Sequence, residues 1–220
     1  MKKIMFNEPF GLQQATFEKI KDMTRRIVPQ VILDYVPKYQ HEYYEQTLDT
    51  ISVEDAIMNM IGPEKMFQRY VYQIGEIVAI AQAYENICQF DCVPTWVPTS
   101  KDPSGFIQWD ESKGYSNKMY VKSEYMPRHI KIIDRRLEHM QDISDEDCLR
   151  EGVLIENLRS DYKYGFYTGS YMKTRGRQGT RSVWYKTPRE AYAALIDKVS
   201  RKGTWKRNPL VFVYEYKLID

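Results

Sequence analysis

The C-terminal part of the chain carries the sequence pattern that most constrains the fold. Thr187 fits the N-cap of a helix, with Pro188 at its first position and Glu190 at its third, which makes a capping box. The apolar residues that follow have the spacing of one helix face, and the helix is expected to end at Gly203. Residues 210–218 then alternate as a strand does. A capped helix followed directly by a strand predicts an α+β fold.

Shorter patterns along the chain extend this prediction. We expect one domain over residues 1–220, folded as a mixed β-barrel or curled sheet with flanking helices. A Tyr-, Gln- and Glu-rich stretch at residues 30–72 is predicted to be a helical insertion. The other predicted elements are a strand at 2–6, a helix at 11–23, a strand at 24–28, a strand buried on both faces at 77–81, a long loop at 93–116, a β-like segment at 117–125, a strand at 129–140 and a helix from its cap Ser144 to Arg150.

Composition excludes several classes of protein. The chain is 43% hydrophobic and 28% charged, as folded globular domains are. It has no apolar run near the ~18 residues of a membrane helix, so we expect a cytoplasmic protein. Cys88, Cys92 and Cys148 form an odd, sparse set without a second close pair, and the histidines are scattered, which predicts neither disulfides nor a metal site. No phosphate-loop or dinucleotide motif is present, so no cofactor is predicted.

Basic residues are concentrated in one segment. Residues 159–207 contain 13 Lys and Arg against three acidic residues, a net charge of +10, whereas the rest of the chain carries −8. Such asymmetry is typical of a polyanion-binding face on an acidic body, although it also fits solvated charges on a loop and a helix. Tyrosines precede the segment KTRGRQGTR, so we predict single-stranded RNA contacts there. The residues assigned to this role are Lys173, Arg175, Arg177 and Arg181.

A compact chemical cluster lies near the N-terminus, at the predicted junction of helix and strand. Lys21 and Thr24 could form a minimal base and nucleophile pair, because a desolvated lysine can activate a neighbouring hydroxyl. Strand alternation would place Arg26 on the same face as Thr24. Alternatively, Lys21, Arg25 and Arg26 bind an anionic or carbonyl-rich ligand, or serve only as caps and solvated charges. The first two readings require that Lys21 and Thr24 open into a concave, solvent-reachable pocket.

Residues 19–26, KIKDMTRR, resemble the motif Gly-x-Lys-x-x-(Glu/Thr)-x-Arg of ASCH domains, which belong to the PUA-like superfamily. Other blocks are similar to those of ASCH-like proteins from phages and Bacteroidales. These blocks are Phe10–Phe17, Gly75–Val78, Met126-Pro127, Gln141–Asp147 with Glu151-Gly152, and Trp205–Pro209 before Val211–Glu215. The resemblance covers about residues 1–29, 73–88, 117–155 and 187–220, and leaves out the insertion at 30–72 and the segment 93–116.

The resemblance implies a PUA-like β-barrel whose cleft takes RNA or a modified nucleoside. One bacterial ASCH branch hydrolyses N4-acetylcytidine with a Thr nucleophile, an activating Lys and a Glu on a following strand. Carried over, Thr24 and Lys21 match by position, but the matching strand has Lys131 where the Glu is expected. Lys19 stands in place of the motif's glycine, which predicts an altered turn. Glu76 or Glu124 could replace the missing carboxylate in space.

Three functions follow from the sequence. The first is a non-catalytic module that binds RNA or a modified nucleoside, with Arg25, Arg26, Glu76 and Lys131 as ligand-binding residues. The second is an amidohydrolase acting on an N4-acylated cytidine, with Thr24 as the nucleophile. The third is a protein-interaction accessory factor of phage origin, docking a partner through the insertion at 30–72. The aromatic residues assigned to that docking are Tyr35, Tyr39, Tyr43 and Tyr44.

Overall fold

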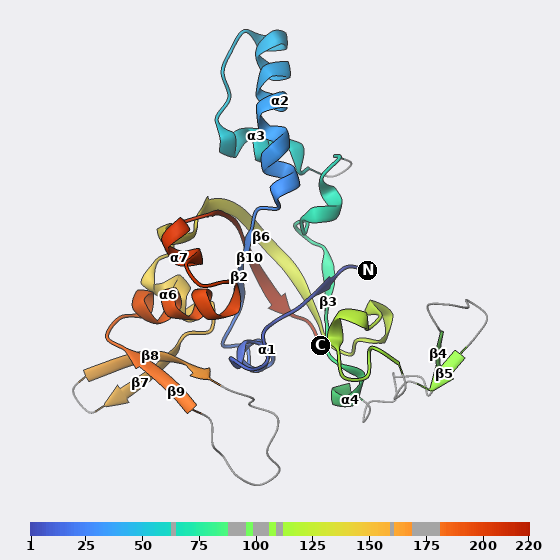
Figure 1. Cartoon of the computed structure of the whole chain (residues 1–220), viewed down its shortest axis with the longest axis vertical. Helices are drawn as coiled ribbons and strands as arrows, with labels where there is room; N and C mark the ends of the chain where they lie inside the picture. Colours follow the sequence, from blue (N-terminus) through green and yellow to red (C-terminus); the bar gives the residue numbers. More distant parts are fainter. Residues whose placement is uncertain (63–64, 88–95, 99–105, 109–111, 159–160, 169–180) are drawn as a thin grey trace.

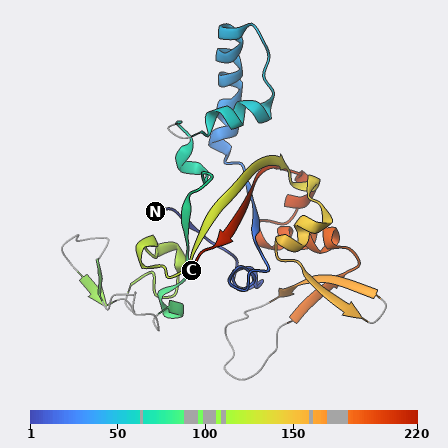
Figure 2. The ribbon, with the colours of Figure 1, turned by 180° about the vertical axis from the view of Figure 1, so that it is seen from behind.

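The computed structural model describes residues 1–62, 65–87, 96–98, 106–108, 112–158, 161–168 and 181–220. Helices and strands alternate along the chain and form a mixed α+β fold, as predicted (Figure 1). A central sheet occupies the middle of the molecule, a helical excursion extends from one end, and a small sheet lies beside the C-terminal helices. The same arrangement is seen from behind in Figure 2.

The central sheet has five strands in the order β1-β3-β6-β10-β2. Strand β1 runs parallel to β3, and the other neighbours are antiparallel. Between Glu215 and Tyr216 the register shifts because Ile133 of β6 is unpaired, and this bulge bends β6. Among the described residues this sheet is not closed into a barrel, and β1 and β2 are its edges. The bounds are β1 Lys3–Ile4, β2 Met23–Ile27, β3 Ile77–Ile80, β6 His129–His139 and β10 Leu210–Leu218.

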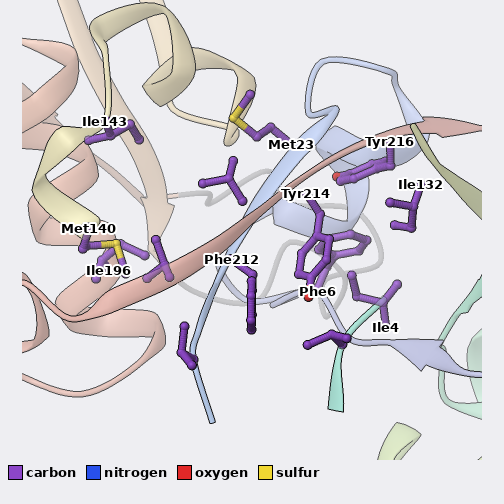
Figure 3. Packing of buried hydrophobic residues seen from close by; sticks show 14 of the residues in the cluster. Ile4, Phe6, Met23, Ile132, Met140, Ile143, Ile196, Phe212, Tyr214 and Tyr216 are labelled. Carbon is purple, nitrogen blue, oxygen red and sulfur yellow. The ribbon is translucent and has the colours of Figure 1, made fainter. Parts of the chain in front are cut away.

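Aromatic and aliphatic side chains of the central strands form the core (Figure 3). Phe6 and Tyr216 lie with ring centroids 5.6 Å apart, and both are almost fully buried. Strand β3 is covered on both faces, as predicted, because Val78 packs into the main cluster and Ala79 into a second, smaller one. Because β1 pairs with the buried strand β3, its position in the sheet is set, and the residues that follow it, including Phe6, lie against the core.

The first helix, α1 Leu12–Phe17, is shorter than the predicted helix at 11–23. It ends because the chain turns at Lys19, whose φ of 60° is left-handed. The N–H groups of Ile20 and Lys21 both donate to the carbonyl of Ala15, which closes this turn. Lys19 occupies the position of the motif's glycine, and its left-handed backbone is one that glycine adopts without strain. The altered turn relative to the motif stays a prediction.

The C-terminal half supplies helices beside the sheet. Ser144 caps α5 Asp145–Arg150 by accepting from the N–H of Asp147, and Thr187 caps α6 Pro188–Val199 in the same way. Both caps confirm the sequence prediction. The short helix α7 begins after Gly203 and covers Thr204–Arg207.

A three-stranded antiparallel sheet packs near α6 and was not predicted. Its strands are β7 Leu154–Leu158, β8 Asp161–Thr168 and β9 Arg181–Tyr185. Gly165 is required here because a Cβ at that position would overlap the Val183 carbonyl of the neighbouring strand.

The segment at 30–72 is helical in its described part, as predicted. It contains α2 Gln30–Thr47, α3 Val53–Met60 and the 3-10 turn η1 Gln68–Tyr70. Ser52 caps α3, and this excursion projects from the sheet at the top of Figure 1. Of its tyrosines, Tyr35 and Tyr39 pack partly against the main core, whereas Tyr44 is half-exposed. Tyr43 is likewise partly exposed, and the docking role of this segment stays a prediction.

Two predictions between β3 and β6 are wrong. The predicted loop at 93–116 contains a pair of short antiparallel strands, β4 Trp96–Pro98 and β5 Phe106–Gln108. The predicted β-like segment at 117–125 instead forms two 3-10 turns, η3 Lys118–Tyr120 and η4 Ser123–Tyr125. A further short helix, α4 Tyr84–Ile87, follows β3.

Within the described part of the chain, none of the helices has both the length and the apolar character that a membrane crossing requires.

Candidate functional site

A pocket of about 230 Å³ opens between β2, the segment after β1 and helix α6. Lys21 and Thr24 both line it, so the structure brings the predicted pair together in a concave site. We call it the Thr24 pocket. Its other lining residues are Met5, Phe6, Asn7, Leu12, Arg25, Arg26, Ile27, Met140, Glu151, Tyr192, Leu195, Ile196, Val199 and Ser200. The wall combines apolar and aromatic side chains with several polar and charged groups, a mixture found in small-molecule sites.

Lys21 is the most deeply held charge of this pocket, with a relative exposure of 2%. Its Nζ donates to the carboxylate of Glu151 at 2.7 Å, to the backbone carbonyl of Glu151 at 2.8 Å and to the carbonyl of Met23. Phe6 places its ring 5.8 Å from the same nitrogen. Burial lowers the pKa of Lys21, while the charge of Glu151 acts in the opposite direction. The amine is thus both desolvated and oriented.

The carboxylate that contacts Lys21 is that of Glu151, a residue that was not predicted to lie there. It lies directly after α5 and is 5% exposed. The next residue, Gly152, has a φ of 100°, and a Cβ there would stand 3.1 Å from Leu12 and 3.4 Å from the Lys21 side chain. Glycine therefore lets the end of α5 approach Lys21. The one sequence feature that pointed to Glu151 was the Glu151-Gly152 pair, which is part of the resemblance to ASCH-like proteins.

Thr24 is the second residue of β2, opposite Tyr214 of β10, and is 5% exposed. Its hydroxyl makes no hydrogen bond within the described part of the chain, to Lys21 or to any other residue. A pocket-lining hydroxyl without an internal partner is free to contact a ligand. Hydrogen bonds between catalytic groups are often long before a substrate binds, so the present separation from Lys21 is compatible with proton transfer in a complex.

Arg25 is held by acidic side chains. Its guanidinium donates to Glu138, Asp147 and Glu151, at distances between 2.6 and 3.3 Å, and also to the sulfur of Met23. All five of its N–H donors are engaged in this way. We therefore assign Arg25 to holding Glu151 in position rather than to contacting phosphates.

The carboxylates around Arg25 belong to a larger ion-pair network behind the Thr24 pocket. Arg136 of β6 bonds to Glu138, Asp147 and Glu215, and Arg150 of α5 bonds to Asp22 and Glu215. We call this set the paired network. Its members are Lys21, Asp22, Arg25, Arg136, Glu138, Asp147, Arg150, Glu151 and Glu215. It ties β2, β6, β10 and α5 together around the end of Lys21.

Arg26 lies on the same face of β2 as Thr24, as alternation predicted. It lines the Thr24 pocket and two neighbouring pockets of about 550 and 450 Å³. One of its nitrogens, Nη2, donates to the carbonyl of Met5, and its Nε is buried without a partner. Arg26 forms no ion pair with any described carboxylate. It therefore offers an uncompensated charge at the meeting point of the three pockets.

Other predicted ligand-binding residues lie elsewhere. Glu76 accepts from Lys2 at 3.0 Å and from the N–H of Gln73, and it does not line the Thr24 pocket. Lys131 is exposed on β6, between Ile77 of β3 and Lys217 of β10, away from Lys21. Glu124 is an exposed partner of Lys122. Neither Glu76 nor Glu124 lies beside Lys21, whose carboxylate partner is Glu151.

Most of the predicted RNA-contacting residues lie outside the described residues, namely Lys173, Arg175 and Arg177. Arg181 begins β9, opposite Thr168 of β8. Cys88 and Cys92 also lie outside the described residues, and Cys148 is buried in α5. No group of His, Cys, Asp and Glu side chains suited to a metal ion occurs among the residues that the structure describes.

Comparison of the chain with models of protein families, with curated proteins and with solved structures finds no match.

Proposed function

We propose that this chain hydrolyses the amide bond of a small acylated nucleoside, such as an N4-acylated cytidine. The observation that carries the proposal is a buried Lys21–Glu151 ion pair beside an unpartnered Thr24 hydroxyl in one pocket. Burying two charges costs free energy that an apolar pair would not. Their position at a pocket wall, together with a perturbed lysine pKa, is a pattern typical of functional sites.

The proposed reaction runs through Thr24. Neutral Lys21 accepts the hydroxyl proton while the Thr24 oxygen attacks the amide carbonyl, and the proton then passes to the departing amine. Water hydrolyses the resulting Thr24 ester and releases the carboxylic acid. At rest Lys21 is an ammonium paired with Glu151; burial lowers its pKa, and transfer of one proton to Glu151 gives the neutral amine that accepts the Thr24 proton. Arg25 keeps Glu151 in place for this purpose.

The surroundings of Thr24 support a nucleoside-sized ligand. The Thr24 pocket shares Met5, Phe6, Asn7, Arg26 and Val199 with the neighbouring pocket of about 450 Å³. The two spaces are therefore adjacent, and we propose that a base beside Thr24 directs its sugar towards the second one. We also propose that the fold is an ASCH-type, PUA-like one. The left-handed turn at Lys19 and the grouping of Lys21, Thr24 and Glu151 support this assignment.

The test is incubation of the protein with N4-acetylcytidine and measurement of released cytidine by chromatography. Thr24→Ala should lower kcat/KM by at least ~10³-fold, because it removes the nucleophile. Thr47→Ala, on the exposed part of α2, is the matched control and should keep full activity. Lys21→Arg should also be inactive, because arginine keeps the charge but cannot accept a proton.

Two outcomes would overturn the hydrolase. One is equal turnover by Thr24→Ala and the wild type. The other is binding of N4-acetylcytidine without any cleavage, which would favour the non-catalytic nucleoside-binding module instead. If the chain is a hydrolase, kcat/KM should rise with pH as Lys21 loses its proton in the free enzyme. This rise is an independent test of Lys21 as the general base.

A further inference from the structure

We infer that a second pocket, at the base of the helical excursion, binds the phosphate of a nucleotide. This insertion pocket has a volume of about 550 Å³. It is separate from Lys21 and Thr24, and the inference does not depend on the proposed hydrolysis. Its lining residues are Met1, Lys2, Lys3, Arg26, Arg69, Tyr70, Val71, Tyr72, Val121, Ser123 and Tyr214.

The charges around this pocket favour an anion. Four of the lining residues are cationic, and none of the described lining residues is acidic. Lys2 is neutralised by Glu76, but Lys3, Arg26 and Arg69 form no ion pair with any carboxylate of the described chain. Three cations without a carboxylate partner line this one pocket, and an anion bound there would reduce their mutual repulsion. Such a group is the usual environment of a bound phosphate.

Unused hydrogen-bond donors point to the same conclusion. The Lys3 ammonium donates to the carbonyls of Met119 and Val121, which leaves its third N–H without a described partner. Burial lowers the pKa of Lys3, so a nearby anion would stabilise its charged form. Arg26 retains the buried, unpartnered Nε and free donors at its other terminal nitrogen.

The aromatic part of the wall distinguishes a nucleotide from a simple phosphate. The guanidinium of Arg69 lies 4.7 Å from the centre of the Tyr70 ring and donates to the Tyr70 hydroxyl. This pair forms a flat, cationic and exposed surface on which a planar base can stack. The pocket is large enough for a phosphate, a sugar and a base together, within the usual range of ligand sites.

The test is calorimetric titration of the full chain with cytidine monophosphate, cytidine and inorganic phosphate at low salt. Cytidine monophosphate should bind at least 10-fold more tightly than either cytidine or phosphate alone. Arg69→Gln should remove most of this preference. Lys65→Gln is the matched control, because it removes an equal charge from the same excursion at an exposed position outside the pocket. It should bind as the wild type does.

Equal affinity for cytidine monophosphate and cytidine would overturn the phosphate site. Equal affinity for cytidine monophosphate and inorganic phosphate would overturn the contribution of the base. An unchanged preference in Arg69→Gln would place the phosphate elsewhere and reject the insertion pocket. Circular dichroism of both variants checks that they are folded. None of these titrations involves bond cleavage, so their failure is distinct from failure of the hydrolase.

Discussion

Two groups of cations in this molecule differ in how their charge is balanced. In the paired network every cation contacts at least one carboxylate, and Lys21 and Arg25 are almost fully buried. Around the insertion pocket, Lys3, Arg26 and Arg69 have no described carboxylate partner. A fully buried charge is unstable without a counter-charge inside the protein. A charge that stays partly hydrated needs none and is accessible to a ligand. The presence or absence of a carboxylate partner therefore distinguishes the cations that stabilise the Thr24 pocket from those that we propose contact a ligand.

The largest expected effect comes from breaking a pair in the buried group. Glu151→Gln should lower the free energy of unfolding by about 3–5 kcal/mol, because Lys21 and Arg25 would lose a buried counter-charge. Urea denaturation followed by circular dichroism measures this change. Arg69→Gln, which removes an unpaired and exposed cation, should alter the same quantity by less than about 0.5 kcal/mol.

A double variant keeps this comparison testable if Glu151→Gln does not fold. Lys21→Met with Glu151→Leu replaces both buried charges by apolar side chains and should recover most of the lost stability. The double variant should still be inactive. If Glu151→Gln is no less stable than Arg69→Gln, the proposed contrast between the two groups is wrong.

A smaller effect is expected from acid titration of the paired network. Hydrogen bonds from Arg150 and Arg136 hold the pKa of Glu215 below its usual value of 4.5. Because the folded-state pKa is lowered, the stabilisation is complete above about pH 4.5 and is lost as the pH falls through the folded-state value. Glu215→Gln should therefore make the free energy of unfolding less dependent on pH between about 3 and 5. Urea denaturation across this range would contradict the assignment if both proteins show the same slope.

The smallest effect concerns the strained turn that leads to Lys21. Lys19→Gly should raise the free energy of unfolding by about 0.5–1 kcal/mol, because glycine adopts a φ of 60° without the clash of a Cβ. Lys19→Ala removes the same charge but keeps the Cβ, so it should give no gain. Chemical denaturation distinguishes the two variants, and equal stability for both would show that backbone strain is not responsible.

Local chemistry is sufficient to predict most helices and central strands of this chain. The caps at Ser144 and Thr187 are encoded within four residues and form as predicted. The prediction of a β-like segment at 117–125 is wrong, although its residue types favour strands. The Asn117 side chain accepts from the N–H of Met119 and starts a 3-10 turn instead. Local side-chain bonding outweighs residue preference when no neighbouring strand is available for pairing.

The site itself was only half predictable. Lys21 and Thr24 are three residues apart at the junction of α1 and β2, so the chain itself predicts their proximity. Glu151 is 130 residues from Lys21, and no local pattern brings the two together. The sheet β7-β8-β9 was missed for another reason. Its alternating tyrosines and lysines were interpreted as a basic, aromatic surface rather than as the period of a strand.

The helical excursion leaves the sheet immediately after β2, the strand of Thr24, and returns through Arg69 and Tyr72. On its return, Tyr72 is fastened to Lys3 by its hydroxyl and to Tyr214 by its N–H. The return of the excursion thus supplies one wall of the insertion pocket, while β2 and Lys21 belong to the central part of the fold. A change in the length of the excursion would alter that wall without moving the residues of β2.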